Sequence, residues 1–123
     1  MELPKECKFT NSARIIQIDS VLLVFAFGAK DSNGVGVYSL DVSNPYKVSV
    51  TVKKPLQRKT GIAGVALYNQ EIAYLTGGQQ NSAKRCSTYD IKKDEWYKAP
   101  SLNMGRTGHA SCCLSEQVFV FGG

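Results

Sequence analysis

Short runs of apolar residues, separated by glycine, proline and small polar residues, recur along the whole chain. Several runs alternate apolar and polar positions, as in residues 48–52, and this period of two is typical of half-buried β-strands. No stretch of a dozen residues has the spacing of an amphipathic helix. The pattern predicts ten strands, at residues 15–18, 21–27, 35–42, 48–52, 63–68, 72–76, 87–91, 95–97, 110–114 and 118–121. We therefore predict an all-β fold.

The predicted strands also repeat in blocks. The double glycines Gly77-Gly78 and Gly122-Gly123 each follow an apolar strand, and they lie 45 residues apart. A repeat of about 45 residues with four short strands has the size of one β-propeller blade. The repeat divides the chain into an N-terminal extension (1–11), a degenerate blade (12–60), a clear blade (61–107) and the first half of a third blade (108–123).

The second block carries a spaced set of residues after its apolar strand, namely Gly77-Gly78, Tyr89, Trp96 and Arg106. In this set the chain resembles the kelch repeat family, whose pattern is an apolar strand, a double glycine, a tyrosine, a tryptophan at fixed spacing and a following arginine. The first block departs from the pattern, with Ala29 in place of the second glycine. The resemblance implies kelch-type β-propeller blades of four antiparallel strands, of which about two and a half are present.

The signature residues have structural explanations. A glycine after a strand allows a positive φ or a close approach of backbones, which suits Gly77, Gly78, Gly122 and Gly123. Tyr89 and Trp96 can wedge between neighbouring sheets and keep a polar tip for a hydrogen bond. Asp90 suits the turn to the following strand. Arg106 can bridge carbonyl groups of the adjacent blade, because its guanidinium group carries five donors.

The charge pattern narrows the choice of partner. The formal net charge is +5, but the basic residues fall in short groups beside turns and form no continuous stripe with stacking aromatics. We therefore expect no nucleic-acid partner.

The longest apolar run, residues 21–27, is too short to cross a membrane, and the first residues lack the apolar core of a signal peptide. We expect no membrane association.

The cysteines and the histidine give little indication of a catalytic or metal site. The cysteines have no CxxC spacing and are interpreted as reduced thiols, with a metal site or a disulfide as the alternative, at positions Cys7, Cys86, Cys112 and Cys113. This favours a cytoplasmic protein without metal or cofactor. His109 lies three residues before Cys112, but nothing in the sequence supplies an orienting partner for a Cys–His nucleophile pair. A satisfied histidine at the start of an inner strand is favoured.

Alternating strands bring the loops after the second and fourth strands of each blade to one face. Kelch propellers typically recognise proteins with loops on this face, so the resemblance points to residues 29–34, 53–60, 79–85 and 101–107. Their polar and basic side chains could meet an acidic peptide, although ordinary solvated loops would have the same composition. The candidate partner-binding residues are Arg58, Gln79, Gln80, Asn81, Ser82, Lys84, Arg85 and Arg106.

Three functions follow from the resemblance. The first is a non-catalytic protein-interaction module, often a substrate-recruiting adaptor of a ubiquitin ligase. The second is a kelch-like propeller enzyme, such as a copper oxidase or a sugar isomerase, and the third is an actin-associated scaffold. A copper site needs several ligands, and the chain has a single histidine.

The number of blades is below the four to eight that usually close a propeller. Two and a half blades would leave open edges and uncovered faces. We therefore expect a fragment or truncated product, or else a chain that self-associates to complete the fold.

Overall fold

The computed structural model describes residues 12–27, 34–57, 63–78 and 83–122. These residues form ten strands and confirm the all-β prediction. The strands are β1 (Ser12–Ile18), β2 (Val21–Phe27), β3 (Val35–Asp41), β4 (Ser49–Leu56), β5 (Gly64–Tyr68), β6 (Ile72–Thr76), β7 (Cys86–Asp90), β8 (Glu95–Ala99), β9 (Ala110–Leu114) and β10 (Gln117–Phe121). Across the described part of the chain, no helix is long and apolar enough to span a membrane.

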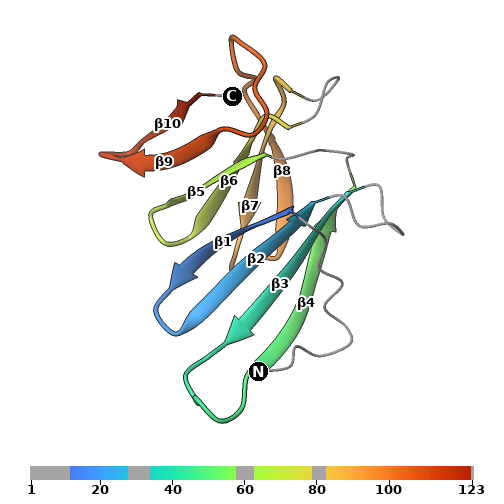
Figure 1. Ribbon diagram of the computed structural model, residues 1–123, viewed down its shortest axis with the longest axis vertical. Coiled ribbons are helices and arrows are strands. Elements are labelled where there is room, and N and C mark those ends of the chain that lie inside the picture. Colours follow the sequence, from blue (N-terminus) through green and yellow to red (C-terminus); the bar gives the residue numbers. More distant parts are fainter. Residues whose placement is uncertain (1–11, 28–33, 58–62, 79–82, 123) are drawn as a thin grey trace.

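Each sheet is an antiparallel meander in sequence order. Strands β1–β4 form one four-stranded sheet, β5–β8 form a second, and β9 pairs with β10. The first strands of consecutive sheets, β1, β5 and β9, pack beside one another, whereas β4 packs near β8 (Figure 1). The sheets are thus propeller blades with β1, β5 and β9 as inner strands. This arrangement confirms the predicted kelch-type blades of four antiparallel strands.

Several strands are longer than their sequence predicts, as β1 begins at Ser12 and β8 ends at Ala99, and β4 has the largest extension. The apolar alternation ends at Val52, but β4 continues through Pro55 to Leu56. A proline is tolerated here because β4 is the outer strand of its sheet, where one edge needs no ladder partner. The register of β3 against β4 also shifts between Val35 and Val37, which accommodates the irregular segment.

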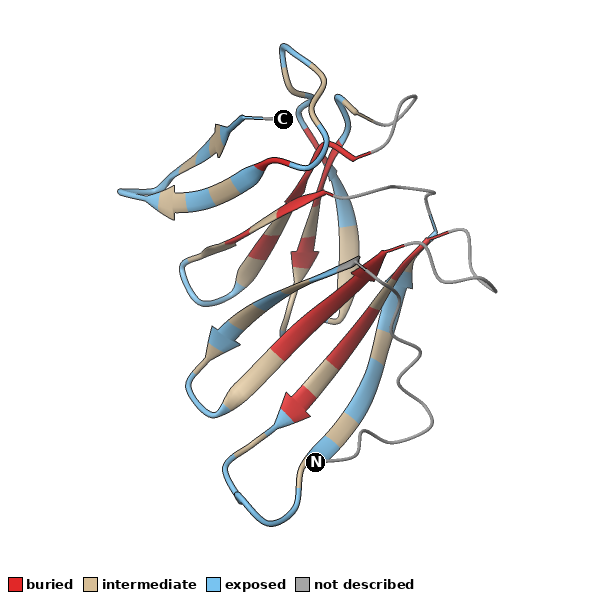
Figure 2. Ribbon diagram, viewed as in Figure 1, coloured by how far each residue is buried: buried red, intermediate tan, exposed pale blue. Residues whose placement is uncertain are grey.

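The main core lies between the first two sheets, at a contact that we call the first junction. Its buried side chains come mainly from β2 and β3, and Figure 2 shows the buried residues concentrated along these strands. They are Leu23, Phe25, Phe27, Val35, Val37, Ala63, Ala73, Leu75 and Tyr89. Because alternate residues of a strand point to opposite faces, β2 buries a second set of side chains on the other face of its sheet.

The connections divide between two rims. The strand ends joined by the connections β2–β3, β4–β5, β6–β7 and β8–β9 lie on one side of the sheets, which we call the loop rim (Figure 1). The connections β1–β2, β3–β4, β5–β6, β7–β8 and β9–β10 lie on the opposite side, the hairpin rim.

Candidate functional site

The first junction is fastened by the tryptophan of the signature. The Trp96 ring lies 5.0 Å from the ring of Tyr89 and 6.2 Å from that of Phe25, measured between centroids. Its Nε1 donates a hydrogen bond of 2.9 Å to the backbone oxygen of Lys54 in the neighbouring sheet. The predicted wedge with a polar tip is therefore observed. It holds β8 in a fixed position against β4.

Asp94 adds a polar clamp at the same junction. Its carboxylate accepts hydrogen bonds from the Tyr89 hydroxyl and, at 2.8 Å, from the backbone N–H of Lys54. Partial burial opposes its ionisation, but these hydrogen bonds outweigh that effect and keep the pKa of Asp94 below its ordinary value. Burial, together with the same hydrogen bond, raises the pKa of Tyr89 far above its ordinary value, so the phenol remains a donor. Lys54 Nζ also pairs with Glu95 at 2.8 Å.

The double glycine joins two connections of the loop rim. Gly77 has a φ of +67°, and a Cβ at this position would lie 2.4 Å from the backbone oxygen of Arg106. The N–H groups of Gly77 and Gly78 donate to the backbone oxygens of Arg85 and Arg106, both at 2.9 Å. Arg106 in turn donates from its backbone N–H to Ala83 at 2.9 Å. The described ends of the β6–β7 and β8–β9 connections thus form one hydrogen-bonded unit.

The side chain of Arg106 reaches the third sheet, as expected for a bridging arginine. Its Nη1 donates a hydrogen bond of 2.6 Å to the backbone oxygen of Gly122, at the end of β10. Asp90 also fills the role expected of it, since its carboxylate accepts a hydrogen bond of 3.0 Å from the N–H of Lys93 in the β7–β8 turn. The guanidinium of Arg106 is consequently occupied in part by the fold itself.

The loop rim presents basic and apolar side chains together. Lys84 and Arg85 are exposed, and Met104 keeps 67% of its surface accessible. Lys84 lies close to Gly105, so residues of both connections contribute to one patch. We call Lys84, Arg85, Asn103, Met104 and Arg106 the rim patch. The sequence did not single out Met104. Of the other candidate residues, Arg58, Gln79, Gln80, Asn81 and Ser82 lie outside the described residues.

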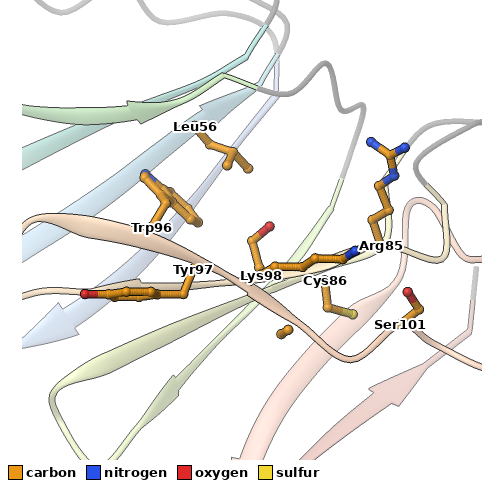
Figure 3. Close-up of a pocket in the computed structure, with 9 residues that line it drawn as sticks. Leu56, Arg85, Cys86, Trp96, Tyr97, Lys98 and Ser101 are labelled. Atoms are coloured by element: carbon orange, nitrogen blue, oxygen red, sulfur yellow. The ribbon is translucent and has the colours of Figure 1, made fainter.

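A cavity of about 400 Å³ opens beside this patch, between the first and second sheets. Leu56 and Trp96 line one part of it, and Arg85, Lys98 and Ser101 line another (Figure 3). The remaining lining residues are Cys86, Ser87, Tyr97 and Ala99. The lining contains two cationic side chains and no carboxylate. Sequence reasoning identified Arg85 but not Lys98.

The contact between the second and third sheets, the second junction, has a polar centre. His109 is buried at the start of β9, as expected, and its Nε2 lies 2.9 Å from Thr76 Oγ1. Thr76 Oγ1 also lies 2.8 Å from Ser111 Oγ. Burial, followed by the charges of Arg106 and Arg14, lowers the pKa of His109. The expectation of a fully satisfied histidine holds only for Nε2, because the buried Nδ1 has no hydrogen-bond partner.

Arg14 was missed by the sequence analysis. From β1 it donates to the backbone oxygens of Ala63 and His109, both at 3.3 Å, and so links all three sheets near the inner strands. No repeated spacing in the sequence marks this arginine.

The described cysteines and other possible metal ligands form no metal site. Cys86 is buried, Cys113 is partly buried and Cys112 is exposed, and none of these three described cysteines forms a disulfide. In the part of the chain that the structure describes, no three His, Cys, Asp or Glu side chains come together as a metal site would require.

Comparison with known proteins identifies relatives of modest identity. Alpha-scruin of Limulus polyphemus is 25% identical over 114 residues, which cover 81% of this chain and 12% of that protein. Kelch-like protein 22 of Rattus norvegicus is 31% identical over 104 residues, which cover 78% of this chain and 16% of that protein. The chain therefore spans only 12–16% of the length of these relatives. No protein-family model matches it.

A solved structure shares the fold. A fungal alcohol oxidase of the AA5 family, in complex with copper, superposes with a TM-score of 0.66 at 24% identity. The match covers 94% of this chain and 26% of the oxidase. At this identity, the likeness is evidence for the fold alone.

Proposed function

Since this chain belongs to the kelch-repeat family, we propose that it is a non-catalytic protein-interaction module that binds its partner with the loop rim. The observation that carries the proposal is the rim patch itself. Two connections are hydrogen-bonded into one unit, and that unit presents Lys84, Arg85 and Met104 to solvent. Loops fixed on a rigid scaffold are common positions for binding residues.

The composition of the rim patch supports a protein partner. Exposed methionine and arginine are enriched in protein interfaces, and methionine adapts its shape to the surface it meets. Its basic side chains and the net charge of +5 favour a partner with an acidic surface or an acidic segment. In its finer form, the proposal is that a cytoplasmic partner is bound as the substrate of a ubiquitin ligase, a role that kelch domains often have.

The proposal is tested by affinity capture with two variants of equal charge change. One variant, Lys84→Glu with Met104→Ser, alters the rim patch. The matched control, Lys92→Glu with Tyr46→Ser, alters an exposed lysine and an exposed aromatic residue on the hairpin rim. Each chain is immobilised and exposed to cell extract, and the retained proteins are quantified by mass spectrometry.

We expect at least one protein to be retained by the unaltered chain and by the control. The amount of this protein retained by the rim variant should be about tenfold lower. Such a loss corresponds to about 1.4 kcal/mol, the size expected when contributing interface side chains below hot-spot strength are removed. Equal retention by both variants would place the interaction elsewhere. Retention of nothing above background by the unaltered chain would contradict a binding function.

A further inference from the structure

Two cationic side chains, Arg85 and Lys98, line the cavity between the first two sheets. Across the described residues, neither the guanidinium of Arg85 nor the ammonium of Lys98 makes an ion pair or a side-chain hydrogen bond. Two other lysines near this sheet are paired, since Lys54 of β4 contacts Glu95 and Lys92 of the β7–β8 turn contacts Glu71. Both side chains are exposed, and an anion placed between them could accept charge-assisted hydrogen bonds from each.

Strand pairing brings these charges to the cavity. In the β7–β8 hairpin, Lys98 lies opposite Ser87 and Trp96 lies opposite Tyr89, so Lys98 and Trp96 share one face of the sheet. Arg85 immediately precedes β7 and lines the same cavity. In Figure 3 the amino end of Lys98 is directed toward the side of the cavity on which Arg85 lies. The anion-binding groups therefore gather at one end.

The opposite end of the cavity is apolar and fixed in position. Leu56 and Trp96 are both partly buried and pack against the core of the first junction. The Trp96 ring cannot turn freely, because its Nε1 is hydrogen-bonded to Lys54 and its ring contacts Phe25. A ligand side chain that covers Trp96 would therefore meet a preorganised surface, which lowers the entropic cost of binding.

We infer that this cavity binds two adjacent side chains of a partner peptide, an anionic one between Arg85 and Lys98 and an apolar one against Trp96 and Leu56. This inference rests on the proposed protein-binding function and adds a second contact, on the wall between two blades beside the loop rim. At about 400 Å³ the cavity has the size of a small-ligand site, which suits a pair of side chains. Arginine and lysine bind carboxylate and phosphate alike, so either group can supply the anion.

The single tryptophan of the chain provides a specific reporter. The indole N–H resonance of Trp96 is followed by nuclear magnetic resonance while capped dipeptides are added to the ¹⁵N-labelled chain. The probes are N-acetyl-Leu-Glu-amide, N-acetyl-Leu-phosphoserine-amide and the neutral N-acetyl-Leu-Gln-amide. We expect saturable shifts with the anionic probes and about tenfold weaker binding of the neutral one, because it cannot form charge-assisted hydrogen bonds. The tighter anionic probe identifies carboxylate or phosphate as the preferred group.

Variants of the two cations complete the test. Arg85→Gln and Lys98→Gln each weaken the anionic probes about tenfold, whereas Lys92→Gln, on the hairpin rim, leaves them unchanged. Within the described residues the Lys98 side chain makes no ion pair or hydrogen bond, so the spectrum of the unliganded Lys98→Gln chain is expected to match that of the unaltered chain. Equal affinity for the neutral probe, undiminished affinity after Lys98→Gln, or no saturable shift at millimolar peptide would overturn the inference.

The two proposals fail in distinguishable ways. A captured protein that is lost with the rim variant but fully retained by Lys98→Gln leaves the binding function intact and removes the cavity from it. Specific binding of the anionic dipeptides without any rim-dependent partner contradicts the proposed function and leaves the anion site in place.

Discussion

The two junctions between sheets are held together by different chemistry. The first junction buries aromatic and aliphatic side chains, and its polar clamp of Trp96, Asp94 and Lys54 lies at the outer strands. The second junction is centred on Thr76 and His109 beside the inner strands. The signature residue Trp96 thus contributes to the outer clamp and Arg106 bonds the third sheet, whereas the contact between Thr76 and His109 depends on residues outside the signature. Each junction should respond to a different perturbation.

The largest effect is expected from opening the first junction. Trp96→Ala removes two ring contacts and the hydrogen bond to Lys54, and should lower the free energy of unfolding by about 3 kcal/mol. Urea unfolding followed by circular dichroism measures this change. The neighbouring Tyr97, with 49% of its surface exposed, is the control, and Tyr97→Ala should cost less than about 1 kcal/mol. Equal costs would show that the outer clamp contributes little.

A smaller effect is expected where the double glycine approaches the second junction. In Gly77→Ala the new Cβ would lie 2.4 Å from the backbone oxygen of Arg106, in addition to the strain of a positive φ. Gly122 has a similar φ of +74° but open space around it. Substitution of Gly122 therefore measures the backbone strain alone, without a steric clash. We expect about 1 kcal/mol for Gly122→Ala and about 2–3 kcal/mol for Gly77→Ala, by the same unfolding measurement. Identical values would mean that the close approach is relieved at no cost.

The smallest effect is a difference between the two junctions in how their stability depends on pH. Because burial lowers the pKa of His109, the unfolded chain binds a proton that the folded chain resists, and stability falls as the pH drops below about 6.5. The contribution of Asp94, whose pKa is also lowered, is present above about pH 4 and is lost only in more acidic solution. Between pH 7 and pH 5, the amides of β9 should therefore lose protection from hydrogen exchange before Trp96 fluorescence changes. An unchanged pH response in His109→Gln would contradict this assignment.

Much of the fold follows from sequence patterns. All ten strands follow from apolar runs and turn residues, and Gly77, Trp96 and Arg106 fill the structural roles that their chemistry favours. These predictions succeed because they depend on local backbone conformation or on a repeated spacing. The extension of β4 past Pro55 was missed, because its cause is the position of β4 at the edge of the sheet.

The candidate site was only partly predictable. Lys84 and Arg85 could be placed on the loop rim from strand alternation. The approach of Lys98 to Arg85 depends on the register of the β7–β8 hairpin, and Leu56 comes from another sheet. Arg14 likewise joins residues distant in sequence. Such contacts between sheets leave no local signal, because they are set by how whole blades pack.

The central claim, that the loop rim binds a protein, is tested most directly by hydrogen exchange of the chain with and without the partner recovered by capture. The account predicts slower exchange at residues 83–85 and 101–107, and no change in the turns at 19–20, 69–71 and 91–94. Protection confined to those turns, or to the exposed faces of β9 and β10, would contradict it.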